Sequence, residues 1–392
     1  MCDVVRDEKY YMEDGSCILL VENTLFNVHR SMLSRDSSSF ATMFSLPQGD
    51  TPMEGTSDDN PIVLPGDTVA QFRNFLWALY ALPPELMVVH TAQADLVRLM
   101  DIALVANKYS FKTLETWALD AIQEYVTRQP SPLFPRPALA PSGALAQFSA
   151  ATTPTIPTAP PFKPGLARLV RLAHLCAHEP LLGTMVGLLK RLMCSSVPYA
   201  YLAMCLADEL DLRTLKGAAY LEVMQKTKVV AREHVDIPVC ATPDADGESE
   251  DEEDDGIEVL LSPDGRLVVS GPQKLRLLCG YHGLSRAWEH LRLHPPPFEH
   301  ASSCGATWHQ HGCTQSWSDF WKEKTRTEGI LSLGLADVLG RLRAVAKEFD
   351  KWGSATYMHH DCRLSAKRVI QEKIKQVEEE LPDYFSEEKE MV

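Results

Sequence analysis

Short apolar runs separated by polar turns mark the first part of the chain. Residues 17–21 form an unbroken apolar run of strand length, and after the polar pair Glu22-Asn23 a second strand carries Phe26 and Val28. A short apolar run bounded by turn formers is typical of a strand covered on both faces. Asn23 tolerates the left-handed conformation that a tight reversal needs. The pattern therefore predicts a β-hairpin.

Helical spacing begins directly after this hairpin. The serines from Ser37 to Ser39 offer an N-cap to a helix that carries Phe40, Met43 and Phe44 at i, i+3 and i+4. Farther along, residues 61–64 predict a short strand. The pair Thr68 and Gln71 then forms a capping box. Apolar faces predict the next three helices at 69–80, 96–103 and 114–125.

This order of elements resembles the opening of a BTB/POZ domain. The family pattern reads F-x-x-H-[RK]-x-x-L and then S-x-x-F-x-x-[LM]-F. The positions that match it are Phe26, His29, Arg30, Leu33, Ser37, Phe40, Met43 and Phe44. The resemblance covers residues 10–128 and implies an α+β fold, a short mixed sheet flanked by helices, followed by mostly α-helical regions.

The resemblance also implies roles for two polar residues of the motif. His29 is expected to fix the start of a helix, and Arg30 to line a surface pocket in dimeric members of the family. In those members an acidic residue ahead of the first strand pairs with this arginine. Here Ser16 occupies that position and Asp14 lies two residues earlier. The first thirteen residues lack the alternating apolar pattern of an exchanged N-terminal strand, so a homodimer is implied by the family alone.

Composition and periodicity divide the rest of the chain into four segments. They are a Pro-rich linker at 129–165, a helical block at 166–232, an acidic disordered segment at 237–256, and a mainly helical C-terminal region at 257–385. Ten prolines lie between Pro130 and Pro164, which is incompatible with helix and typical of an extended linker. In the acidic segment, Ser249 precedes four acidic residues and is a candidate for modification by an acid-directed kinase.

The C-terminal region predicts a hairpin followed by helices. The runs 259–261 and 267–269 flank a turn at residues 263–265. The last helix of the preceding block is expected at 213–230. Later helices are expected at 273–279, 283–293, 316–324, 335–347 and 364–381. This region, with Trp317 and Trp321, resembles the C-terminal regions of fungal BTB proteins.

Composition narrows the function classes. The chain has 392 residues, 45% of them hydrophobic, and a net charge of −15, which argues against direct nucleic-acid binding. Ten cysteines are too sparse for a disulfide framework at this length. No secretory signal or membrane span of about 20 apolar residues is expected. An intracellular protein, cytoplasmic or nuclear, is expected.

One group of residues suggests metal chemistry. Cys304, His309, His311 and Cys313 lie within ten residues, and thiolate and imidazole are the ligands that zinc prefers. The residues His359, His360 and Cys362 recur later in the chain. No paired C-x2-C is present, so the alternative is a loop with buried thiols and surface histidines. We expect no bound metal and no cofactor.

The expected function is binding rather than catalysis. No phosphate-binding loop, nucleophile elbow, zinc-protease motif or dinucleotide glycine pattern occurs, so no enzyme is expected. The resemblance implies self-association and recruitment of other proteins through the BTB domain. Candidate interface residues are Met32, Leu33, Met43 and Phe44. Two alternatives remain: a substrate adaptor bound to a cullin-type ubiquitin-ligase scaffold, although no repeated substrate module is visible, and an indirect transcriptional regulator.

Overall fold

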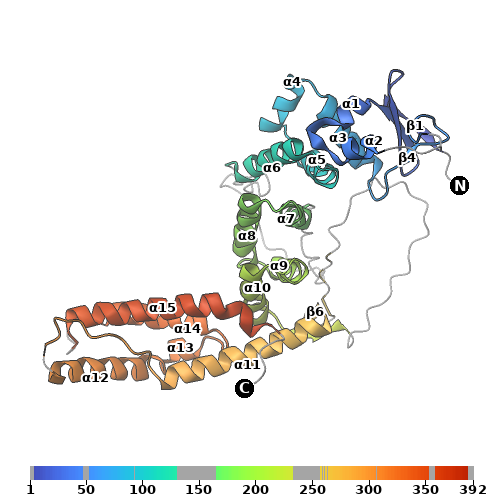
Figure 1. Ribbon diagram of the computed structural model, residues 1–392. Coiled ribbons are helices and arrows are strands. Elements are labelled where there is room, and N and C mark those ends of the chain that lie inside the picture. The colour runs from blue at the N-terminus through green and yellow to red at the C-terminus, as the bar shows by residue number, and fades with distance from the viewer. Residues whose placement is uncertain are drawn as a thin grey trace, which may run out of the picture. The chain divides into compact units, whose positions relative to one another are not determined.

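The computed structural model divides the chain into two compact units, Met1–Gly187 and Leu188–Val392 (Figure 1). Each unit is considered by itself. The residues that the structure describes are 4–46, 53–91, 93–129, 165–232, 257, 259, 261–262, 264–305, 307–352 and 358–386. Most of the predicted linker at 129–165 and the whole acidic segment at 237–256, with Ser249, lie outside them.

A small mixed sheet forms one part of the first unit. The predicted hairpin is confirmed, because β2 and β3 pair antiparallel from Cys17↔Val28 to Val21↔Thr24. Glu22 rather than Asn23 takes the left-handed conformation at the turn, with φ 51°. Each outer strand pairs in parallel with one hairpin strand, which gives the order β1-β3-β2-β4. The four strands are β1 (Val5–Tyr11), β2 (Cys17–Val21), β3 (Thr24–Val28) and β4 (Ile62–Val63).

Helices flank this sheet, so the first unit has a mixed α+β fold (Figure 1). In chain order, the helices up to residue 175 are α1 (Arg30–Leu33), η1 (Arg35–Ser37), α2 (Ser39–Ser45), α3 (Val69–Tyr80), α4 (Pro83–Leu86), η2 (Met87–His90), α5 (Leu96–Lys108), α6 (Lys112–Thr127) and α7 (Leu166–Leu175). Both predicted caps are confirmed. The Ser38 hydroxyl accepts a hydrogen bond from the amide of Ala41 at 3.3 Å, and the capping box of Thr68 and Gln71 opens α3. The core between sheet and helices is rich in aromatic side chains, including Phe26, Phe40, Phe72, Phe75 and Phe111.

Strand β1 corrects the expectation for the first thirteen residues. It pairs with β3, and its register shifts between Arg6 and Tyr11. Because this irregularity breaks the two-residue period, the buried side chains are Asp7 and Tyr10, three positions apart. The Asp7 carboxylate accepts hydrogen bonds from the Tyr10 amide at 2.8 Å and from the Arg73 guanidinium at 2.6 Å. The strand is therefore tied to α3 by a buried polar group that no apolar pattern reports.

We expect the substitution Asp7→Asn to loosen β1 and to lower the free energy of unfolding by about 1–3 kcal/mol. The amide would present an NH₂ group where the carboxylate now accepts hydrogen bonds from Arg73 and two backbone amides. Hydrogen–deuterium exchange of residues 5–11 together with thermal unfolding measures the effect. The control is Glu8→Gln, because Glu8 is exposed on the same strand. Equal exchange in the two variants would contradict this role of Asp7.

The second unit is mainly helical, as expected. The helices of the predicted block are confirmed, although α8 spans the boundary between the two units. The elements after α7 are α8 (Glu179–Met193), α9 (Val197–Glu209), α10 (Arg213–Lys226), β5 (Val229–Ala231), β6 (Leu267–Val269), α11 (Gly271–Leu293), α12 (Thr307–Lys324), α13 (Glu328–Leu331), α14 (Val338–Lys351) and α15 (His360–Tyr384). Among the helices that the structure describes, none has the length and apolar character needed to span a membrane.

The predicted hairpin at 259–269 is confirmed in part. Among the described residues of this segment, the Gly265 amide donates to the Ser262 carbonyl at 2.8 Å and an antiparallel bridge joins Leu261 to Leu267. Strand β6 also pairs in parallel with β5 over three residues. The helix predicted at 213–230 therefore ends at Lys226, because the β-branched pair after it belongs to β5.

A single 23-residue helix, α11, replaces the two helices predicted at 273–279 and 283–293. Its glycines allow close packing rather than a break. A Cβ atom on Gly280 would lie 2.0 Å from a ring atom of Phe385, and one on Gly283 would lie 2.9 Å from the ring of Tyr384. Helix α11 continues through both glycines. The C-terminal end of α15 occupies the space that side chains at these two positions would fill.

Candidate functional site

Three of the motif residues build the core of the first unit. Phe26, Leu33 and Phe40 are almost completely buried. The ring of Phe26 packs edge-on against Phe72 at 5.1 Å, and the ring of Phe40 stacks on Tyr109 at 4.5 Å. These contacts fix the hairpin and α2 against α3 and α5. Leu33, a predicted interface candidate, is therefore a core residue, whereas Met32, Met43 and Phe44 are half-buried.

His29 occupies the N-cap position of α1 and connects it to the end of α3. The Tyr80 hydroxyl lies 3.0 Å from both the backbone amide and Nδ1 of His29. Because this hydroxyl accepts from the amide, its own proton is directed to Nδ1, and the protonated Nε2 faces the Asp14 carboxylate at 3.2 Å. Burial raises the pKa of Tyr80, so the hydroxyl keeps its proton. Asp14 thus pairs with His29, not with Arg30.

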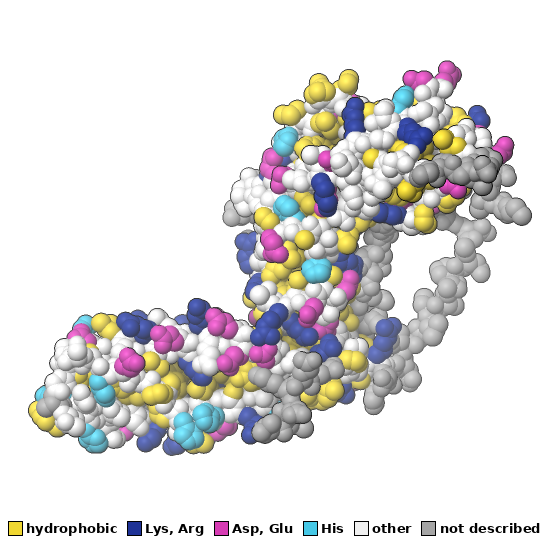
Figure 2. Space-filling model, in the orientation of Figure 1, with side chains coloured by type: hydrophobic (Ala, Val, Ile, Leu, Met, Phe, Trp, Pro, Cys, Tyr) yellow, Lys and Arg dark blue, Asp and Glu magenta, His cyan; other side chains and the backbone are white. Residues whose placement is uncertain are grey.

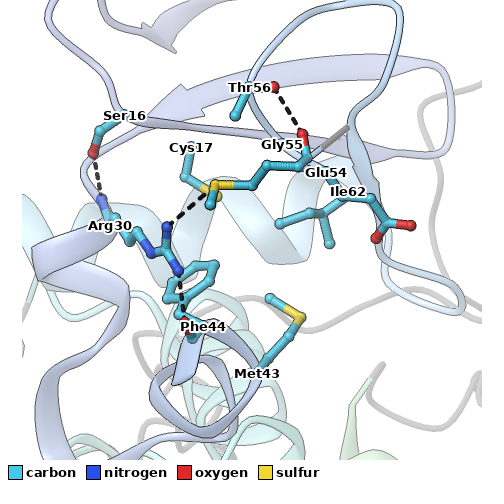
Figure 3. Close-up of a pocket in the computed structure, with 10 residues that line it drawn as sticks. Ser16, Cys17, Arg30, Met43, Phe44, Glu54, Gly55, Thr56 and Ile62 are labelled. Atoms are coloured by element: carbon cyan, nitrogen blue, oxygen red, sulfur yellow. Dashed lines mark hydrogen bonds between the residues drawn. The ribbon is translucent and has the colours of Figure 1, made fainter. Parts of the chain in front are cut away.

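Arg30 lies at the floor of a shallow pocket (Figure 3). Its backbone amide donates to the Ser16 hydroxyl at 2.9 Å, and its guanidinium donates to the Phe44 carbonyl at 2.8 Å. The guanidinium also lies 4.2 Å from the centre of the Phe44 ring and 3.8 Å from the Met53 sulfur. Within the described residues, no carboxylate forms an ion pair with Arg30.

The pocket is small, and both polar and apolar groups line it. Its volume is about 40 Å³, well below the ~300–1,000 Å³ typical of small-molecule sites. Burial raises the pKa of the Cys17 thiol in its wall to about 11, so this sulfur is a protonated thiol at neutral pH rather than a nucleophile. The lining residues are Ser16, Cys17, Arg30, Met43, Phe44, Met53, Glu54, Gly55, Thr56 and Ile62.

One wall of the pocket, residues 53–56 of the loop at 53–60, was not predicted as part of a site. Gly55 takes φ 75°, and its carbonyl accepts from the Ile18 amide at 2.8 Å, which joins the loop to β2. Asp58 accepts hydrogen bonds from the Tyr11 hydroxyl at 2.6 Å and from Arg6 at 2.9 Å, and these bonds hold the pKa of Asp58 below its usual value. The cluster of turn-forming residues at 55–60 indicates a turn, but it does not reveal which strands the turn contacts.

A second pocket lies at the end of α3, beside α4 and η2. It has a volume of about 230 Å³, and the Arg98 guanidinium covers the Trp77 ring in its wall at 4.9 Å. Leu82, Met87 and Val88 are exposed near it. Figure 2 shows hydrophobic side chains gathered over α4. This second apolar surface was not predicted.

The structure separates the four metal candidates into two pairs. Cys304 and Cys313 are buried, with their sulfur atoms 3.8 Å apart. His309 and His311 lie on α12 with exposed side chains. The thiols are buried and the two histidines exposed, as the alternative to a metal site predicts, but only Cys304 lies in a loop, since Cys313 and both histidines lie on α12.

Two residues outside that sequence window complete the group around the cysteines. His300 and Cys362 place a ring nitrogen and a sulfur beside them, with all four ligand atoms within 4.8 Å of one another. Cys362 had been noted in the sequence, but its separation from Cys313 gave no reason to join them. His300 was missed, although its i, i+4 spacing from Cys304 is a recognisable sign.

Comparisons with known proteins add no assignment. A scan against models of protein families found no match to this chain, and a search of curated proteins found no match either. The BTB/POZ resemblance thus depends on the motif residues and on the order of the elements around them.

Proposed function

We propose that this chain is a protein-interaction protein whose first unit acts as a BTB/POZ-like module, self-associating and recruiting other proteins. The observation that carries the proposal is the Arg30 pocket, with exposed or half-buried apolar side chains beside it. We define the rim as three apolar residues that line the pocket and are half-buried or exposed: Met43, Phe44 and Met53.

The size and chemistry of the pocket support binding of a protein side chain rather than a substrate. A volume of about 40 Å³ accommodates a methyl or a small polar group, not a metabolite. Its cysteine is protonated and inert at neutral pH. We therefore propose a binding role, not a catalytic one.

The rim supports apolar association. Met53 is 43% exposed, and Met43 and Phe44 are half-buried. Removing such surface from water contributes about 25 cal/mol per Å². A stable interface of standard size buries about 1,600 Å² in total, so the rim would form the centre of a larger contact.

A second copy of the chain is the partner that the charges favour. Arg30 has no carboxylate partner among the described residues, and the exposed Glu54 lies in the same pocket. In a two-fold symmetric contact every pairing between residues occurs twice, with the two copies exchanged. Glu54 of each copy would therefore face Arg30 of the other copy. The separate apolar surface at Leu82, Met87 and Val88 is then left for a different protein.

We expect the full-length chain to migrate as a dimer, with twice the 43.7 kDa of one chain, in size-exclusion chromatography with light scattering. The double variant Met43→Glu/Met53→Glu should be monomeric at micromolar concentration, because two more carboxylates would join Glu54 around a single arginine in the contact. The control is Leu82→Glu, which adds a charge at the other apolar surface and should leave the mass unchanged.

Two outcomes would contradict the proposal. One is a wild-type chain that stays monomeric at tens of micromolar. The other is a double variant that stays dimeric while Leu82→Glu becomes monomeric, which would move the self-association surface to α4 and η2. Circular dichroism of all variants checks that the fold is retained.

A further inference from the structure

Four side chains from three separate parts of the second unit meet at one point. His300 and Cys304 lie in the segment between α11 and α12, Cys313 lies on α12, and Cys362 lies in the first turn of α15. The three thiols are at most 2% exposed, and the imidazole is half-buried. We call these four residues the thiol–imidazole cluster.

The spacing within the cluster fits a metal ion. Zinc–sulfur bonds of about 2.3 Å in a tetrahedron place two sulfurs about 3.8 Å apart, and a sulfur and an imidazole nitrogen about 3.6 Å apart. The sulfurs of Cys304 and Cys313 are 3.8 Å apart, and the Cys362 sulfur lies 3.7 Å from Nδ1 of His300. A disulfide would need a separation of about 2.05 Å. These two distances match those between ligands of one ion, and all four ligand atoms lie within 4.8 Å of one another.

The hydrogen bonds around His300 direct its free lone pair into the cluster. The Thr314 hydroxyl donates its single proton to the Gln310 carbonyl at 3.0 Å. It can therefore only accept from Nε2 of His300, which lies 3.1 Å away. The proton of the neutral imidazole is then on Nε2, and Nδ1 presents its lone pair to the Cys362 sulfur. A metal-binding histidine commonly has its other nitrogen held in this way.

Backbone amides also point at the sulfur atoms. The His359 amide donates to the Cys313 sulfur at 3.2 Å, and the Ala301 amide donates to the Cys362 sulfur at 3.5 Å. Such donors stabilise a thiolate more than a thiol, because they place partial positive charge on the sulfur. These outer contacts complete a site in which both the ligands and their supports are present.

We propose that His300, Cys304, Cys313 and Cys362 bind one zinc ion as a structural site. Three thiolates and one imidazole form a set that zinc favours, and four protein ligands close the tetrahedron, so no position is left for a substrate. Each thiol loses its proton to solvent when the ion binds. The ion joins the starts of α12 and α15 to residues 294–306, whose described positions contain no helix or strand. This site departs from the expectation of no metal and is independent of the Arg30 pocket.

The test measures the zinc content of the full-length chain by inductively coupled plasma mass spectrometry. The chain is purified without a histidine tag. We expect about one zinc per chain. The variants His300→Ala and Cys362→Ser should each lower the zinc content at least tenfold. The double variant His309→Ala/His311→Ala is the matched control, since it removes two neighbouring histidines on α12 and should retain the ion. The opposite result would be loss of zinc in the control and retention of zinc in Cys362→Ser. It would assign the ion to residues 304–313 and overturn the site.

A second measurement separates loss of zinc from loss of fold. Zinc is removed from the wild-type chain with a chelator, and Co²⁺ is added. The absorption bands of tetrahedral cobalt bound to thiolates should appear at one equivalent, and zinc should abolish them. Cys279→Ser, which removes an exposed thiol, should give the same spectrum as the wild type. Either of two results would overturn the proposal. One is the absence of these bands, and the other is a disulfide between Cys304 and Cys313 in a chain that is isolated without zinc.

Discussion

Replacing Phe26 by alanine should lower the free energy of unfolding of the first unit by about 3–5 kcal/mol. The Phe26 ring is fully buried, packs edge-on against Phe72 and belongs to β3, which has a neighbour on both sides. Removing the ring leaves a cavity. Strand β3 cannot move to fill it, because hydrogen bonds to β1 and β2 hold both of its edges. A domain has only about 5–15 kcal/mol of stability in total, so the unit would be close to unfolding. Denaturant unfolding of the full-length chain, followed by far-UV circular dichroism, measures the change.

The control for Phe26→Ala is another phenylalanine of the same motif. Phe44 is half-buried at the pocket, so Phe44→Ala should cost clearly less stability than Phe26→Ala. Phe44→Ala should instead weaken self-association, because it removes the ring beside the Arg30 guanidinium. If both substitutions destabilise the chain equally, the division of the motif into core and pocket residues is wrong.

The second large effect is expected at Gly280 of α11. Alanine normally stabilises the interior of a helix by about 1 kcal/mol relative to glycine. Here its Cβ would lie 2.0 Å from a ring atom of the buried Phe385, so the ring must leave its position. We therefore expect Gly280→Ala to reverse the usual sign and to lower the free energy of unfolding by about 2–3 kcal/mol.

The control is Gly312→Ala on α12, where an added Cβ would meet no atom within 4 Å. This substitution should leave stability unchanged or raise it by up to about 1 kcal/mol. Thermal unfolding of the two variants and of the wild-type chain provides the comparison. A stabilised Gly280→Ala variant would show that the end of α15 does not pack on α11 as described.

Local signals predicted the elements that local interactions determine. The antiparallel hairpin joins strands separated by only two residues, and the caps at Ser38 and Thr68 satisfy the first amides of their own helices. Both kinds of contact connect residues close in sequence. The same reasoning placed most helices, with errors at their ends of up to nine residues, since α12 begins at Thr307 and not at residue 316. It failed for β1, because its register shift and its buried carboxylate at Asp7 leave no apolar period.

The candidate sites were predicted only in part. The motif indicated Arg30, Met43 and Phe44, which do line one pocket, but the opposite wall at 53–56 belongs to a turn whose contacts depend on the fold. The metal candidates followed from proximity in sequence, which gave Cys304 and Cys313, two members of the thiol–imidazole cluster. Proximity also suggested His309 and His311, because a window of ten residues does not report which side of a helix faces inward.

The sequence by itself determined the α+β character of the first unit, the helices of the second unit and the N-caps that start several of them. These depend on hydrophobic period and on hydrogen bonds within a few residues. Only the tertiary structure decided that β6 pairs with β5, that Gly280 and Gly283 receive the end of α15, and that Cys362 joins His300. Each of these contacts joins residues more than thirty positions apart, and such pairs are selected by the packing of whole elements.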